Sequence, residues 1–143
     1  MNLHATDFEK SYIALRQKER RVYSDRELLQ LPDIDEAHPH FIEWQARKES
    51  ASRLMRYLSR HMDLKKILEV GCGNGWLSAQ LASLENKVVT GMDINVTELA
   101  QAERVFGTRN NLQFLHEGAG DPKTVGSGDD KEIKIRSAVG KIL

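Results

Sequence analysis

The chain has 143 residues, which suits one domain with a modest hydrophobic core and is hard to divide into two. Its 21 lysines and arginines balance 21 aspartates and glutamates, so no net charge draws in nucleic acid or an anionic membrane surface. A single cysteine excludes an internal disulfide, and the sequence has neither an apolar run of membrane-spanning length nor a secretory signal, so we expect a cytoplasmic protein.

The chain opens with two signals for the start of a helix. A capping-box pattern begins at Thr6, ahead of apolar residues at helical spacing, and predicts a first helix over residues 7 to 21. A second box begins at Ser24 and predicts a short helix. Pro32 should end that helix, because its ring cannot continue the hydrogen-bond ladder. Residues 32 to 40 then form a loop.

A longer amphipathic helix is predicted over residues 41 to 62, where apolar residues that include Trp44 recur at steps of three, four and seven. The character of the sequence then changes. Residues 67 to 70 make a short apolar strand that runs directly into a glycine-rich turn at 71 to 75. A helix over residues 77 to 84 follows at once.

The same alternation continues along the chain. Residues 88 to 93 are a predicted strand, 96 to 106 a helix capped by Asn95, and 112 to 115 a third strand. Strand, helix, strand, helix and strand in this order are typical of a doubly wound parallel sheet. The predicted fold class is therefore α/β, with a helical extension ahead of the sheet.

The pattern weakens near the end of the chain. Residues 121 to 130 are rich in Gly, Asp, Lys and Ser, and residues 132 to 135 could form one further strand. We therefore divide the chain into a helical extension (1–40), a sheet-forming unit (41–120) and a tail of uncertain structure (121–143). With three strands assigned, the sheet is expected to be incomplete.

The glycine-rich turn indicates a ligand site. Glycines at 71, 73 and 75 let the backbone approach a ligand closely, and the following helix start presents amide N–H groups to it. A dinucleotide fingerprint would need glycine at position 76, where this chain has Trp76. The turn could instead simply pack a helix against a strand.

The segment Glu69-Val70-Gly71-Cys72-Gly73-Asn74-Gly75 resembles the E/D-x-G-x-G-x-G signature of class I S-adenosylmethionine (SAM)-dependent methyltransferases, a Rossmann-like family. The resemblance extends over roughly residues 41 to 118. It implies SAM as the cofactor and a small molecule as the methyl acceptor. It also implies that Glu69 helps to hold the methionine ammonium, and that Gly71, Gly73 and Gly75 pack against the methionine part and the ribose, with Cys72 beside the cofactor.

The strand ends supply further candidates for cofactor binding. A carboxylate at Asp93 can accept hydrogen bonds from both ribose hydroxyls, and the resemblance gives it that role. By the same resemblance Ile94 would lie against the adenine ring, although a plain core position is the alternative. Glu117 stands near the place where the family has an aspartate that meets the adenine amine.

Other features have simpler interpretations. His38 and His40 have a spacing that could hold zinc, but no neighbouring cluster completes a ligand set, so we expect an ordinary loop and no metal. The basic residues between 16 and 21 are interpreted as a solvated helix surface. Trp44 could line a substrate pocket or pack in the core, and Cys72 could be a reactive thiol or a small buried residue.

No residue can be named as a catalytic base, because nothing after Gly120 resembles the family's fourth strand. Two hypotheses remain open: a SAM-dependent methyltransferase, or a catalytically silent SAM-binding module. A tail that pairs beside the first strand, with side chains that enter the cleft, would favour the enzyme, and a disordered tail would favour the silent module. An incomplete sheet leaves an open edge, so we also expect a homodimer or poor solubility.

Overall fold

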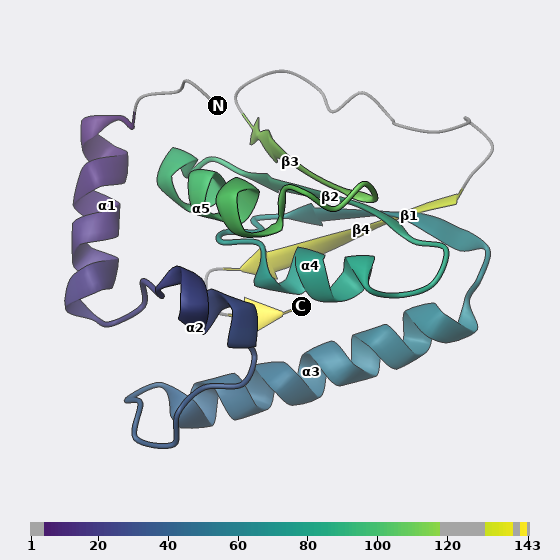
Figure 1. The fold of residues 1–143 in the computed structure, drawn as a ribbon, viewed down its shortest axis with the longest axis horizontal. Helices are drawn as coiled ribbons and strands as arrows, with labels where there is room; N and C mark the ends of the chain where they lie inside the picture. The colour runs from purple at the N-terminus through teal and green to yellow at the C-terminus, as the bar shows by residue number, and fades with distance from the viewer. Residues whose placement is uncertain (1–4, 118–130, 139–140, 143) are drawn as a thin grey trace.

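Figure 1 shows the computed structural model of the chain, which describes residues 5–117, 131–138 and 141–142. Three helices precede the sheet: α1 (Asp7–Lys18), α2 (Asp25–Gln30) and α3 (Phe41–Arg60). Both predicted capping boxes are present. The side chains of Thr6 and Ser24 accept from the backbone amide of the third helical residue, and the side chain of that glutamate accepts from the backbone amide of the cap. The two capping boxes therefore start these helices where the sequence predicts.

The first helix is shorter than predicted. α1 ends at Lys18 rather than at residue 21, because the backbone turns at Arg20, which has a left-handed φ of 58°. The third helix ends at Arg60, two residues after its last fully buried residue, Leu58. Helical spacing alone does not show where a chain turns back, so both ends were placed too late.

The sheet contains β1 (Leu64–Val70), β2 (Val88–Asp93), β3 (Leu112–His116), β4 (Lys131–Ala138) and β5 (Lys141–Ile142). The strand order is β3-β2-β1-β4-β5. The first four of these strands are parallel, whereas β5 pairs antiparallel with β4. Two helices connect the strands, α4 (Trp76–Ala82) after β1 and α5 (Val96–Phe106) after β2. The predicted α/β class with a parallel, Rossmann-like sheet is confirmed.

Strand β4 is the main addition to the sequence prediction. It lies in the tail segment and pairs parallel with β1 in the register Ile67 with Ile133 and Glu69 with Ile135. Ile135 is buried and Ile133 packs against the core. The apolar residues that suggested a strand at 132 to 135 therefore face the core. Residues 118–130, which precede it, lie outside the described residues.

The core forms between the sheet and the helices that flank it. Figure 1 shows α4 and α5 lying along the strands, with the long helix α3 below them. Apolar side chains from the strands, from α3 and from the two connecting helices form one buried cluster, including Leu58, Ile67, Leu81, Val89, Leu99 and Phe114. Trp44 belongs to this cluster and donates from Nε1 to the hydroxyl of Tyr23 at 2.7 Å. The core interpretation of Trp44 is confirmed.

Two expectations about exposure are corrected. Arg16 and Arg21 were interpreted as part of a solvated basic surface, but their side chains are 16% and 27% exposed and both form ion pairs. For Ile94, the alternative to an adenine contact was a plain core position, but its side chain is 56% exposed. Within the described residues, no helix combines the length and apolar character needed to cross a membrane.

Candidate functional site

The glycine turn follows β1 and has the backbone conformation that requires glycine. Gly71, Gly73 and Gly75 have φ values of 77°, 54° and 82°, all in the left-handed region that other residues adopt at a cost. At Gly75 a Cβ would also lie 2.7 Å from the ring of Phe114. The alternating glycines are therefore needed for the path of the turn itself.

Hydrogen bonds tie this turn to the end of β2. The amides of Gly71 and Cys72 both donate to the carbonyl of Met92, at 2.8 and 2.9 Å. The amide of Gly73 donates to Oδ2 of Asp93 at 2.8 Å, and Oδ1 of Asp93 accepts from the amide of Asn95 at 2.7 Å. The structure thus brings together the turn and Asp93, which are twenty residues apart in the sequence.

Asp93 keeps acceptor capacity after these contacts. Each oxygen of an ionised carboxylate has about two lone pairs, and each oxygen of Asp93 has one backbone donor here. The next residue, Ile94, presents an exposed apolar side chain, and its carbonyl lies 3.0 Å from Nε2 of His116. Carboxylate oxygens beside an exposed apolar surface suit a ligand that joins hydroxyl groups to a flat ring.

The other predicted residues occupy distinct environments. Glu69 is 1% exposed and accepts from the hydroxyl of Ser78 at 2.5 Å, so its carboxylate lies in the interior between β1 and α4. Glu117 is exposed just after β3, whose last residue, His116, pairs with Asp93. Glu117 and Asp93 therefore follow neighbouring strands at the same edge of the sheet.

Cys72 is buried within the turn. Burial raises the pKa of its thiol well above the ordinary value, and the nearby carboxylates of Glu69 and Asp93 act in the same direction. The thiol is therefore protonated at neutral pH, which removes the nucleophilic form. This supports the interpretation of Cys72 as a small buried residue.

Two residues at this site were not among the sequence-predicted ones, Glu98 and Arg16. Oε2 of Glu98 lies 3.4 Å from the point where a Cβ on Gly73 would stand. Oε1 of Glu98 lies 3.3 Å from Nη1 of Arg16, which reaches across from α1. Glu98 precedes the buried Ala102 by one helical turn on the inner face of α5. This spacing was the one sign in the sequence that Glu98 points inward.

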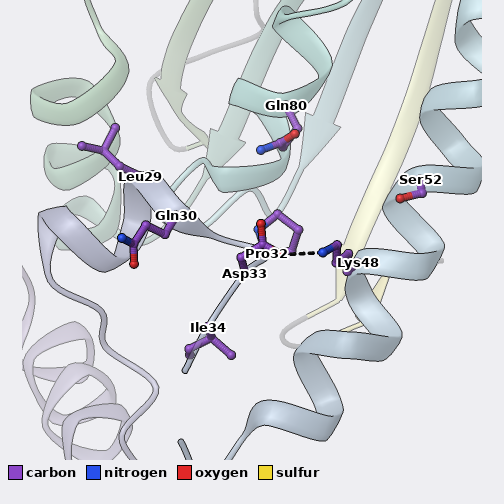
Figure 2. Close-up of a pocket in the computed structure, with 8 residues that line it drawn as sticks. All are labelled: Leu29, Gln30, Pro32, Asp33, Ile34, Lys48, Ser52 and Gln80. Carbon is purple, nitrogen blue, oxygen red and sulfur yellow. Dashed lines mark hydrogen bonds and ion pairs between the residues drawn. The ribbon is translucent and has the colours of Figure 1, made fainter. Parts of the chain in front are cut away.

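A pocket of about 510 Å³ opens next to this ion pair. Its walls come from α1, the segment 21–25 and α5, and Asn74 of the glycine turn and Glu98 border it. A second hollow, of about 660 Å³, is shown in Figure 2 and lies among α2, α3 and Gln80. Lys48 and Asp33 form an ion pair of 2.6 Å on its wall, and no predicted site residue lines it.

The structure bears on two further expectations, that the chain holds no metal and that no catalytic residue can be named. Within the described residues, no group of three His, Cys, Asp or Glu side chains could hold a metal ion. In the loop, the amide of His40 donates to Nδ1 of His38 at 3.1 Å. At the carboxyl end of β4, Arg136 pairs with Val70, and its side chain is exposed. No acidic side chain is described there, so a catalytic residue stays unassigned.

Residues 67–129 match the family model of the methyltransferase domain. Over these residues the chain is similar to that family. The match covers the glycine turn, α4, β2, α5 and β3. The glycine turn, Asp93 and Glu117 thus lie within the matched stretch. Among curated proteins no match was found.

Two solved structures of one enzyme align with TM-scores above 0.5 and show the same fold. The magnesium protoporphyrin IX methyltransferase of Synechocystis PCC 6803 with bound SAH, the demethylated cofactor, aligns with a TM-score of 0.53 and 19% identity, over 73% of this chain and 46% of that one. The same enzyme with bound SAM gives 0.51 and 17%, over 80% and 56%. YjhP from E. coli is 30% identical over 50% of this chain and 30% of its own, with a TM-score of 0.42. The chain therefore spans between 30% and 56% of the length of these solved structures.

Proposed function

We propose that this chain binds S-adenosylmethionine at the glycine turn and transfers its methyl group to a small-molecule acceptor. One observation carries the proposal: the amide of Gly73 and the carboxylate of Asp93 meet at 2.8 Å, within a segment that matches the methyltransferase domain. This contact joins the two parts of the predicted cofactor site into one surface. The solved neighbours support the fold that the proposal needs.

The residues present fit the cofactor. Asp93 would accept hydrogen bonds from the ribose hydroxyls with its remaining lone pairs, and Ile94 would lie against the adenine ring. Glu117 is exposed just after β3, at the same edge of the sheet, and would face the adenine amine. Glu69 and Cys72 lie within and beneath the turn, so their part would be to hold its shape.

The bound cofactor would supply an electrophilic methyl group on a sulfonium sulfur. The contribution of the chain would be to position that group and to exclude water, because displacement at a methyl carbon needs an in-line approach of the acceptor. No described residue is assigned to take a proton from the acceptor. The proposal therefore concerns binding and positioning in the first place.

The pairing of strand β4 beside β1 meets one part of the condition that favours an enzyme over a silent module. It pairs parallel with β1, so the sheet extends beyond the glycine turn on the side opposite β2. In open parallel sheets, ligands bind outside the carboxyl ends of the strands, and a strand on each side of β1 is needed to form that crevice. The second candidate, a silent SAM-binding module, is favoured by the end of β4, where Arg136 pairs with Val70 and the described residues include no acidic side chain.

Calorimetric titration with S-adenosylhomocysteine tests the proposal, with NAD as the control ligand. We expect saturable binding of the former and none of NAD. Absence of binding, or equal binding of both ligands, would contradict the proposal. Incubation with SAM and a panel of small nucleophiles then separates the two candidates, because only an enzyme releases S-adenosylhomocysteine in an acceptor-dependent way.

A further inference from the structure

Helix α1 packs against the domain along one side only. Figure 1 shows it at one end of the molecule, with α2 and α5 on the same side of it. The half-buried residues Glu9, Tyr12, Ile13 and Arg16 recur at helical spacing, and Arg16 reaches Glu98 of α5 at 3.3 Å. These residues form the inner side of the helix. The opposite side faces away from the domain.

The outward side of α1 carries a stripe of exposed residues, which we call the outer stripe. Residues three, four and seven apart share one face of a helix. The members of the outer stripe follow this spacing and are all exposed: Asp7, Phe8, Ser11, Ala14, Leu15 and Lys18. Two of them are large and apolar, Phe8 at 73% and Leu15 at 53% exposed. A surface helix normally turns its apolar residues towards its own domain, so this outward pair indicates a partner outside it.

Opposite charges stand at the two ends of the outer stripe. Asp7 lies in the first turn of α1 and Lys18 in the last. The rise of the helix separates them by about 16 Å, so they cannot pair within one chain. Among the described residues, neither has an ion pair or a side-chain hydrogen bond. The dipole of a single helix favours an acid at its start and a base at its end, but it does not require both on the face of Phe8 and Leu15.

The outer stripe is complementary to a reversed copy of itself. In an antiparallel pair of α1 helices, Asp7 of each copy meets Lys18 of the other, and Phe8 lies near Leu15 of the second copy. The small side chains of Ser11 and Ala14 stand at the centre, where they allow two helix axes to approach. A two-fold axis at this centre forms every contact twice, and the antiparallel arrangement brings opposite ends of the two dipoles together.

We propose that the outer stripe of α1 is a homodimer interface, in which the helices of two copies pack antiparallel. The proposal goes beyond cofactor binding and does not depend on it. Each copy contributes a helix of 12 residues. Such a pair buries less than the roughly 1,200 Å² of a standard specific interface, so the dimer is weak and forms at micromolar concentrations.

Sedimentation of the intact chain over a series of concentrations tests the interface. The wild-type chain should show a monomer–dimer equilibrium. Phe8→Glu should raise its dissociation constant at least about tenfold, because two added charges would be buried near the axis. Ile42→Glu is the matched control, since Ile42 is 83% exposed in the first turn of α3 and should not affect the equilibrium. Both substitutions alter exposed side chains, so far-UV circular dichroism of the dilute variants should match the wild type.

Charge reversal tests whether Asp7 and Lys18 meet between two copies. Asp7→Lys and Lys18→Asp each place like charges together at both ends of the interface. Each should weaken the dimer about 3- to 10-fold at low salt. The double variant, Asp7→Lys with Lys18→Asp, restores opposite charges between the copies and should recover most of the affinity. In a single helix the double variant opposes the dipole at both ends, so a role confined to helix stability predicts the reverse order.

The outcomes decide the proposal. A dimer that Phe8→Glu weakens, that Ile42→Glu leaves unchanged and that the double reversal restores supports it. A monomer at every concentration overturns it. Association that Phe8→Glu leaves unchanged also overturns it, and assigns the contact to another surface such as the edge strand β3. A double reversal that binds no better than the single variants overturns the antiparallel pairing and the proposal with it.

Discussion

Asp93 combines a structural and a proposed ligand-binding role at one carboxylate. It accepts from the amides of Gly73 and Asn95, and in the proposed complex its remaining lone pairs would accept from the ligand. Asp93→Ala should weaken binding of S-adenosylhomocysteine by about 1 to 3 kcal/mol, the cost of losing hydrogen bonds to a charged acceptor. Calorimetry measures this change. Asp93→Asn serves as the milder variant, and an unchanged affinity for the alanine variant would remove Asp93 from the site.

Gly75 tests the backbone requirement of the turn. An alanine there must keep a left-handed φ of 82° and place its Cβ 2.7 Å from the ring of Phe114. Gly75→Ala should lower the free energy of unfolding by about 2 kcal/mol or more, measured by urea denaturation. The double variant with Phe114→Leu should recover the steric part of the loss but not the part due to φ. A fully stable Gly75→Ala would contradict the described turn.

The sequence predicted part of the candidate site. Alternating glycines and a strand-end carboxylate follow a local pattern, so Gly73 and Asp93 could be found from spacing. Arg16 and Glu98 could not be paired in this way, because the contact depends on how α1 folds back onto α5, 82 residues further along. The exposure of Ile94 likewise depends on the tertiary arrangement.

At the scale of elements, α2 is fastened to α5 by Asp25 and Arg104. Oδ1 and Oδ2 of Asp25 accept from Nη2 and Nε of Arg104 at 2.7 and 2.8 Å, and Gln101 donates to Oδ1 at 3.1 Å. Hydrogen bonds from Arg104 and then Gln101 lower the pKa of Asp25 from 3.8 to about 2. The pair is exposed, so its contribution to stability is small and sensitive to salt.

This shift gives a pH prediction with a defined sign. A lowered carboxyl pKa means that the stabilisation is present above the unfolded value near 3.8 and is lost as the pH falls through about 2. The urea midpoint of the wild-type chain should exceed that of Asp25→Asn at pH 6, and the difference should shrink at lower pH. Other carboxylates titrate in both chains and cancel. A gap that does not change with pH would contradict the prediction.

The sequence predicted the starts of the helices better than their ends or the pairing of the last long strand. Capping boxes are local, so the starts of α1 and α2 were found at Thr6 and Ser24. The end of α1 was missed because it depends on the single backbone turn at Arg20. Strand β4 was suggested by alternation alone, since its place beside β1 requires pairing across more than 60 residues.

At the scale of the whole molecule, the sheet ends in two edges, β3 and β5, within the described residues. Unpaired backbone groups on such edges favour pairing with another chain. We therefore predict a dimer or larger association in solution, measured by light scattering over a range of concentrations. A monomeric mass at every concentration would contradict it.

The central claim is that the turn at 71–75 and the end of β2 form one cofactor site. Titration of a ¹⁵N-labelled chain with S-adenosylhomocysteine, followed by NMR, tests it most directly. The account predicts that the amide signals of Gly73, Asp93 and Ile94 shift saturably, while those near the hollow at Pro32 and Lys48 do not. Shifts confined to that hollow, or no shifts at all, would contradict it.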